Sequence, residues 1–301
     1  MTATLAILPI FGVIVLGYVL GRRQWLTAES LVGLRTVTFK LFMPCLLFLG
    51  IARAPLGEVL SPWLLLAYYL PALGVFMLIN LWVWRRSGES TVLGLAGSYS
   101  NNVLIGLPMA ASLFGDDGLM FVYAILAFHS LILFSAHSLF AAIVDARGQQ
   151  LKPLTMLKGM INPIIVGLML GGVVNLLGIT LPDTLTTMLE WLGRAALPCA
   201  LLVLGVGLTR YRLHLSATIG VITMLKLMLF PALVALMTAW LPGISPMARQ
   251  VVVLLAAGPI GVNVLAFVTR PEQQRDIGAC IFLSTLAAAL TLPVWVAWMH
   301  G

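Results

Sequence analysis

The 301-residue chain is 61% hydrophobic and 9% charged, with a mean hydropathy of +1.06, whereas soluble domains carry about 25% charged residues. This composition excludes a water-soluble globular domain and makes the lipid bilayer the solvent of the chain. The net charge of +7 suggests a nucleic-acid partner, but the basic residues lie mainly in short loops between apolar segments, so we expect none.

Apolar segments follow one another along the whole chain, each close to the about twenty residues that a membrane-spanning helix needs. They lie near 3–21, 29–52, 60–84, 91–114, 118–144, 154–178, 184–208, 214–240, 247–268 and 274–299. No positive charge precedes the first segment, and Arg22 and Arg23 follow it, so we interpret it as a retained span and not a cleavable signal. We expect an all-α integral membrane protein with ten transmembrane helices.

The distribution of basic residues predicts the orientation in the membrane. With the N-terminus outside, the external loops hold only Arg53 and Arg249. The cytoplasmic loops then hold eleven basic residues: Arg22, Arg23, Arg85, Arg86, Arg147, Lys152, Lys158, Arg210, Arg212, Arg270 and Arg275. By the positive-inside rule, we expect a multi-pass inner-membrane protein with both termini extracytoplasmic.

The two halves of the chain resemble each other. Pro44 and Cys45 recur 154 residues later as Pro198 and Cys199. Further matches follow in the same order: Pro9 with Pro163, Gly17 with Gly171, Leu70–Leu73 with Phe230–Leu233, and Asn101–Leu104 with Val262–Leu265. We therefore predict two five-helix repeats, 1–150 and 151–301. Because five is odd, the second repeat is inverted in the membrane.

Two of the apolar segments are interrupted by helix-breaking residues at matching places in the two halves: SNNVLIGLPM (Ser100–Met109) and AAGPIGVNVLAF (Ala256–Phe267). Such breaks are tolerated in hydrocarbon only where the freed backbone groups face protein or a wet cavity. In secondary transporters, paired breaks indicate the substrate site. Neither segment contains Asp or Glu, which favours an anion over a cation.

These motifs resemble those of the auxin efflux carrier family, which includes plant carriers and bacterial carboxylate permeases. The resemblance covers the chain through NNVLIGLP, INP (Ile161–Pro163), LGRAALPCALLVLG, AAGPIGV and LTLPVWV. It implies a bile-acid-symporter-like fold in which spans 1, 2, 6 and 7 form a scaffold. Spans 3–5 and 8–10 would form a transport domain that moves as an elevator, with broken helices 4 and 9 crossing. A homodimer is also implied.

The resemblance implies a crossing proline in each broken helix. Pro259 stands at that position in the second helix, but Ser100 replaces the first proline. The candidate substrate-binding residues near the two breaks are Ser100, Asn101, Asn102, Gly258, Pro259, Gly261 and Asn263. Asn101 matches the family's substrate-binding asparagine. Amides can hold a carboxylate, and the alternative is that the asparagines only cap freed backbone groups.

Three basic residues within the spans are further candidates for binding an anion: Lys40, Arg194 and Lys226. A charge inside the bilayer is expensive and is a functional candidate by default. Lys40 and Arg194 each lie four residues before a proline, and Lys226 matches a basic position of the family. The alternatives are that Lys40 reaches the interface and that Glu190, four residues before Arg194, neutralises it.

His129 and His137 lie in the fifth span, where imidazole could relay protons, although both could also be ordinary core histidines. The three cysteines lack metal-ligand spacing, and no Walker loop, HExxH or GxSxG motif is present. We therefore expect no metal, no cofactor and no enzyme activity.

The predicted function is elevator-type transport of a small organic anion, a mono- or dicarboxylate such as malonate or malate. Coupling to a cation stays open. The alternatives are a carrier of indole-type weak acids and a membrane sensor that does not transport.

Overall fold

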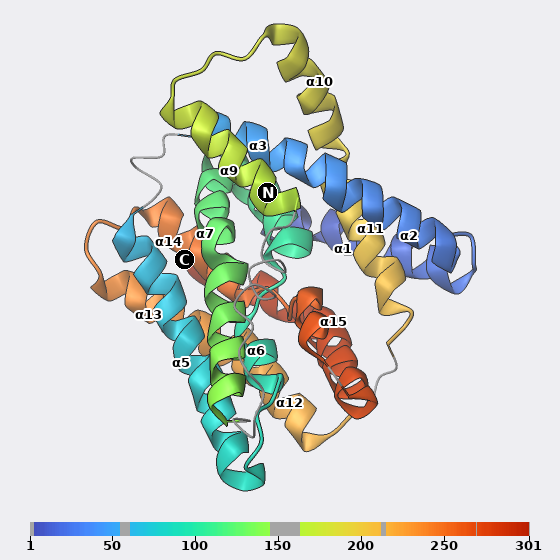
Figure 1. Ribbon diagram of the computed structural model, residues 1–301, viewed down its shortest axis with the longest axis vertical. Coiled ribbons are helices and arrows are strands. Elements are labelled where there is room, and N and C mark those ends of the chain that lie inside the picture. The colour runs from blue at the N-terminus through green and yellow to red at the C-terminus, as the bar shows by residue number, and fades with distance from the viewer. Residues whose placement is uncertain (1–2, 55–60, 145–162, 212–214, 269, 301) are drawn as a thin grey trace. The chain divides into compact units, whose positions relative to one another are not determined.

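The computed structural model describes residues 3–54, 61–144, 163–211, 215–268 and 270–300 (Figure 1). Within these ranges the chain is helical, without strands, and has one isolated antiparallel bridge between Ser100 and Ile260. The helices long and apolar enough to cross a membrane are Ala28–Arg53, Pro62–Ser87, Asn102–Val144, Asp183–Leu208, Ala217–Trp240 and Pro271–Met299. The prediction of an all-α membrane protein is confirmed. The predicted loop that contains Arg147 and Lys158 lies outside the described residues, as does Arg212.

In the first half, the elements are α1 (Ala3–Arg22), α2 (Ala28–Val37), η1 (Thr38–Phe42), α3 (Met43–Arg53), α5 (Pro62–Ser87), α6 (Leu93–Ser98), η2 (Asn102–Gly106) and α7 (Leu107–Val144). The second half contains α9 (Pro163–Leu176), α10 (Asp183–Arg194), α11 (Ala196–Leu208), α12 (Ala217–Met224), η3 (Leu225–Leu229), α13 (Phe230–Trp240), α14 (Pro246–Ala257), η4 (Val262–Phe267) and α15 (Pro271–His300). Within α7, Gly115 has φ 63° and ψ −156°. This left-handed conformation suits glycine and separates two helices at the predicted boundary between apolar segments.

A π-helical turn precedes each of three prolines by the same spacing. The turns η1, η2 and η3 end two residues before Pro44, Pro108 and Pro231, respectively. Proline lacks an N–H, and its ring collides with the carbonyl four residues earlier. In η1 the N–H of Met43 instead donates to the carbonyl of Thr38, five residues back. We infer that the wider turn accommodates the proline without ending the helix.

The contacts divide the chain into two compact units. Unit 1 comprises Met1–Ser61, Val103–Ala127 and Lys158–Arg210, and unit 2 comprises Pro62–Asn102, Phe128–Leu157 and Tyr211–Gly301. Each unit therefore combines segments from both halves of the sequence.

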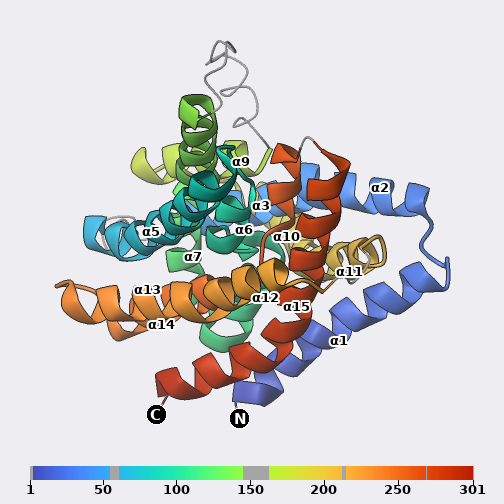
Figure 2. The same ribbon diagram turned by 90° about the horizontal axis from the view of Figure 1, so that it is seen from below.

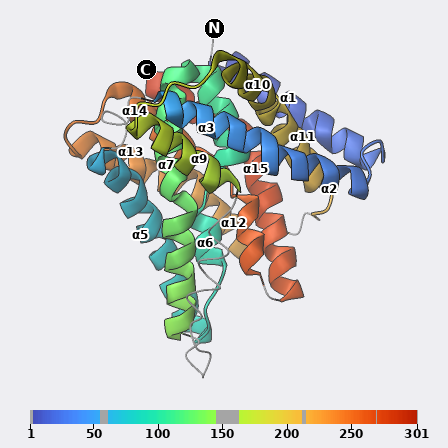
Figure 3. The ribbon, with the colours of Figure 1, turned by 45° about the horizontal axis from the view of Figure 1, so that its top comes forward.

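In unit 1, α1 packs against α11, and α3 packs against α9 (Figure 3). Both contacts are close because glycine lacks a side chain. A Cβ atom on Gly17 would lie 2.6 Å from the carbonyl oxygen of Leu202, and one on Gly171 would collide with the carbonyl oxygen of Phe48. Small residues let helix backbones approach closely inside a membrane. The two contacts are also related in sequence, because 154 residues separate Gly17 from Gly171 and Phe48 from Leu202.

In unit 2, α13 packs against α5 and α14, and α15 packs against α12 and α14 (Figure 2). Tyr68, Phe76 and Phe230 are fully buried in this unit. The end of α14 and the four residues that follow it are also buried. The two interrupted segments therefore meet inside a helical core.

We expect Gly205→Ala to destabilise the protein and Gly207→Ala to leave its stability unchanged or slightly higher. A Cβ atom on Gly205 would collide with the carbonyl oxygen of Ile14 on α1, whereas no atom lies within 4 Å of one on Gly207. Overpacking costs about 1–3 kcal/mol, while alanine favours a helix over glycine. Thermal unfolding of the detergent-solubilised variants measures both effects. Equal unfolding temperatures would contradict the assigned contact.

Candidate functional site

The two interrupted segments pair with each other through their backbones in unit 2. The N–H of Asn101 donates to the carbonyl of Pro259 at 2.8 Å, and the N–H of Gly261 donates to the carbonyl of Tyr99 at 2.9 Å. These bonds flank the antiparallel bridge between Ser100 and Ile260. Each break therefore satisfies backbone groups that the other break exposes, as an apolar surrounding demands.

The second break follows directly from its sequence. Pro259 cannot continue a helix, and the residue before a proline is driven to extended backbone. Gly258 accordingly has φ −59° and ψ 154°. A Cβ atom on Gly261 would lie 2.5 Å from Cδ1 of the Tyr99 ring. Glycine is therefore required where the second segment passes the first.

At the first break Ser100 stands where the second has Pro259, and side chains from neighbouring helices bind the interrupted backbone there. The carbonyl of Ser100 accepts a hydrogen bond from Nε2 of His129 at 3.2 Å. The hydroxyl of Tyr68 donates to Oγ of Ser100 at 3.4 Å, and the hydroxyl of Tyr99 hydrogen-bonds to Ser130 at 2.9 Å. The interruption at Ser100 thus depends on contacts with α5 and α7.

Ser284 on α15 supports the second break. Its Oγ accepts from the N–H of Ile260 at 3.1 Å and donates to the carbonyl of Ile281 at 3.1 Å. Ser284, Tyr68 and Ser130 were not among the residues predicted from the sequence. A fully buried serine within an apolar span is a signal that could have identified Ser284.

Lys226 is fully buried in η3 and lies at the C-terminal end of α14. Its Nζ donates to the carbonyl of Ala256 at 2.6 Å and to the carbonyl of Gly258. Carbonyls at a helix C-terminus lack intrahelical partners and carry partial negative charge. The lysine therefore caps the half-helix that ends at the break, and the structure gives it no place in an open cavity.

Two buried polar atoms beside the first break have no hydrogen-bond partner among the described residues: Oδ1 of Asn102 and Nδ1 of His129. Both side chains are at least 98% buried. The amide nitrogen of Asn102 donates to the hydroxyl of Tyr68 at 3.0 Å. An unsatisfied buried polar group costs about 1–3 kcal/mol, so these atoms mark a place for water or a polar ligand.

Aromatic rings line one side of this polar cluster. The ring of Tyr99 lies 4.3 Å from that of His129 and stacks on Phe134 at 4.9 Å. Phe134 and His137 contact Phe267 at 4.7 and 5.0 Å. His137 is therefore buried among rings, next to the 3-10 turn η4.

Asn263, Lys40 and Arg194 are the remaining predicted residues. Asn263 is exposed, and its side chain hydrogen-bonds with that of Tyr99. Lys40 and Arg194 belong to unit 1 and are exposed. Glu190 pairs with Arg53 at 2.7 Å, and the ion pairs found among the described residues do not include one between Glu190 and Arg194. The carboxylate reaches across to α3 instead of along its own helix.

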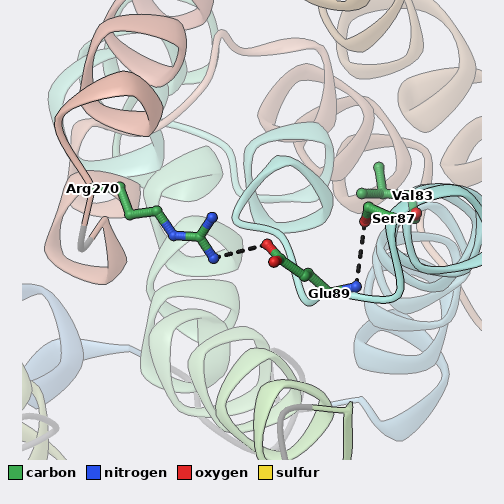
Figure 4. A network of polar contacts seen from close by, with 4 residues as sticks. All are labelled: Val83, Ser87, Glu89 and Arg270. Atoms are coloured by element: carbon green, nitrogen blue, oxygen red, sulfur yellow. Dashed lines mark hydrogen bonds and ion pairs between the residues drawn. The ribbon is translucent and has the colours of Figure 1, made fainter.

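An exposed ion pair connects the loop before α6 with the residues after η4. Nη2 of Arg270 lies 2.9 Å from Oε2 of Glu89 (Figure 4). Glu89 precedes α6 and Arg270 follows η4, so both ends lie on one side of unit 2. Exposed pairs contribute only about 0–1 kcal/mol, so this pair adds little to stability.

The site offers amides, hydroxyls, imidazole and backbone groups, but no carboxylate from either interrupted segment. Among the described residues, no group of three or more His, Cys, Asp or Glu side chains could hold a metal ion. The three cysteines are free. The amides, hydroxyls and imidazole at the breaks can bind a ligand through hydrogen bonds.

Comparisons with known proteins agree with a role in membrane transport. A family model described as "Membrane transport protein" matches residues 2–296. A provisionally named malonate transporter of Rhizobium meliloti (strain 1021) is 31% identical over 299 residues, which cover 95% of this chain and 92% of the relative. An uncharacterised transporter of Methanothermobacter thermautotrophicus is 28% identical and covers 98% of both chains. An uncharacterised transporter of Escherichia coli (strain K12) is 22% identical over 96% of this chain and 95% of its own.

We expect Ser284→Ala to lower the free energy of unfolding by about 1–3 kcal/mol, because it leaves the buried N–H of Ile260 without an acceptor. Thr285→Val is the matched control. The Thr285 hydroxyl donates to the carbonyl of Ile281, so its removal leaves no buried N–H without an acceptor. Thermal unfolding in detergent measures both variants, and an equal loss of stability in the two would refute the role of Ser284.

Proposed function

Because the chain belongs to the auxin efflux carrier family of membrane transport proteins, we propose that it carries a small organic anion across the membrane. The substrate class is a mono- or dicarboxylate such as malonate or malate. The observation that carries this proposal is the pairing of two acid-free breaks beside two buried side chains that can donate to a carboxylate: Asn102, whose amide nitrogen has two N–H groups and gives one to Tyr68, and His129, whose Nδ1 donates once it is protonated. The name of the Rhizobium relative independently favours malonate.

The proposed architecture has ten spans in two inverted repeats. Its support is the relation between two helix contacts in unit 1. Gly17 meets Leu202, and Gly171 meets Phe48. Gly171 is the repeat counterpart of Gly17, and Phe48 is the repeat counterpart of Leu202, each at an offset of 154 residues. The two contacts are therefore the same contact with the roles of the two halves exchanged. A two-fold arrangement of the halves produces this exchange, as expected for an inverted repeat.

We propose that the two units move relative to each other during an elevator cycle. The division of the chain supports this, because unit 2 holds both paired breaks and unit 1 holds most of spans 1, 2, 6 and 7. The segment Val103–Ala127 is assigned to unit 1, which differs from the expected grouping of spans 3–5. The proposal also includes extracytoplasmic termini and a homodimer.

In the proposed substrate site, the amides of Asn101 and Asn102 bind the carboxylate. The backbone from Gly258 to Gly261 borders it, with its N–H groups already donating within the protein. Ser100 and Asn263 flank it. Lys40 and Arg194 stay candidates for the positive charge that the substrate anion needs. A membrane potential that is negative inside favours anion export by about 2.3 kcal/mol per charge per 100 mV, so import needs a coupled cation.

We propose that His129 is the proton carrier. The carbonyl of Ser100 can only accept a hydrogen bond, so Nε2 bears a proton and Nδ1 is the site that gains one. A protonated Nδ1 would donate to a bound carboxylate. His137 is a second candidate for the relay.

An indole-type weak acid is the alternative substrate. The observation in its favour is the stack of Tyr99, Phe134 and Phe267 beside the polar cluster. Such rings suit an aromatic ligand. A carboxylate binds the amides in either case, so competition between the two ligand classes separates the alternatives.

We expect Asn101→Ala and Asn102→Ala to reduce counterflow of labelled malonate into proteoliposomes by about tenfold or more. Hydrogen bonds to a charged group contribute about 1.5–3 kcal/mol. Thr36→Ala, an exposed hydroxyl on α2, is the control. Excess unlabelled malonate should compete, whereas indole-3-acetate should not. Unchanged flux in Asn101→Ala and in Lys40→Ala would overturn the site assignment.

We expect an inward proton gradient to stimulate malonate uptake by the wild type and not by His129→Gln. Glutamine can still donate to the carbonyl of Ser100 but cannot carry a proton. Uptake at equal internal pH, with and without the gradient, measures the difference. His137→Gln tests the second histidine, and a variant at position 129 that keeps full stimulation would exclude His129 as the carrier.

A further inference from the structure

The end of α14 is a site with the character of a cation-binding site. The carbonyls of Ala256 and Gly258 converge on one point, at the negative end of a half-helix. In secondary transporters, carbonyls at such half-helix ends coordinate the coupling Na⁺. In this chain the ammonium group of Lys226 occupies that point.

In the part of the chain that the structure describes, Lys226 is buried without a carboxylate as ion-pair partner. Its side chain is fully buried, and the ion pairs found among the described residues do not include it. Its Nζ lies 5.1 Å from the centre of the Phe230 ring. The two carbonyls and the ring face supply the negative potential that a buried cation needs.

This placement is not a general property of lysine in a π turn. Lys40 is the third residue of η1, four residues before Pro44, and it is exposed. Lys226 is the second residue of η3, five residues before Pro231. In addition to this shift of one position, α14 packs against α13 and η3, and the carbonyls at its end accept from Lys226.

We propose that Lys226 is a tethered cation that fills the coupling-ion position at the second break, so that no free Na⁺ binds there during transport. This inference rests on the proposed function for its meaning in a transport cycle. The positive charge at the end of α14 then belongs to the chain itself and not to a free ion. It moves with unit 2, which contains Lys226. Removing the ammonium should therefore leave a carbonyl-lined site for a small free cation.

The test uses the full-length protein in detergent and measures the unfolding temperature at constant ionic strength. The wild type should unfold at the same temperature in sodium chloride and in choline chloride. Lys226→Ala should unfold several degrees lower in choline chloride, and Na⁺ or methylammonium should restore part of the loss in a saturable manner. Lys40→Ala, the matched lysine in η1, should show no such cation dependence.

Lys226→Met is a second variant, because it fills the space without a charge. It should stay destabilised in every salt. A wild type stabilised by Na⁺ over choline would overturn the proposal, as would Lys226→Ala with wild-type stability or with a loss that no small cation restores. If Lys226→Ala does not fold, the wild-type comparison and Lys226→Met decide.

The outcome is separable from that of the proposed function. Malonate uptake that requires Na⁺ in the wild type would refute the tethered cation while leaving a carboxylate carrier in place. Cation rescue of Lys226→Ala in a protein without carboxylate flux would leave the tethered cation in place and refute the substrate.

Discussion

The structure of unit 2 depends on satisfying backbone groups in a region without water. Where α6 and α14 end, their last C=O groups and the N–H groups of the residues that follow have no helical partners, and hydrocarbon offers none. Tyr99 and Asn101 therefore pair with Gly261 and Pro259. The arrangement brings two segments about 160 residues apart in sequence into contact, and it draws polar side chains from α5, α7, α15 and η3 to the same place.

Those side chains fall into two groups according to how their hydrogen bonds are used. The polar atoms of Lys226 and Ser284 form hydrogen bonds with backbone groups at the second break. Asn102 and His129 each keep one buried atom without a partner among the described residues. The first group holds the breaks open. The second has capacity for a ligand, and this division places the proposed substrate beside the first break and the fixed positive charge at the second.

Part of this arrangement could be predicted from local sequence. Pro259 cannot continue a helix, so the second break could be predicted from the sequence. The match between the two halves then predicted the first break at Asn101. Each π turn ends two residues before a proline, so the proline positions also contain a signal for these turns. The break at Ser100 could not be predicted in this way, because it depends on hydrogen bonds from Tyr68 and His129, which belong to other helices.

The sequence by itself determined the apolar helices, the positions of the breaks and the absence of acids within them, because bilayer thickness and proline geometry act locally. The family also followed from ordered motifs. Only the tertiary structure decided which polar residues meet. Lys40 and Lys226 each lie in a π turn before a proline, at positions that differ by one residue, yet one is exposed and the other is buried at the end of α14. The physical reason is that burial depends on packing against segments distant in sequence, which no local pattern specifies.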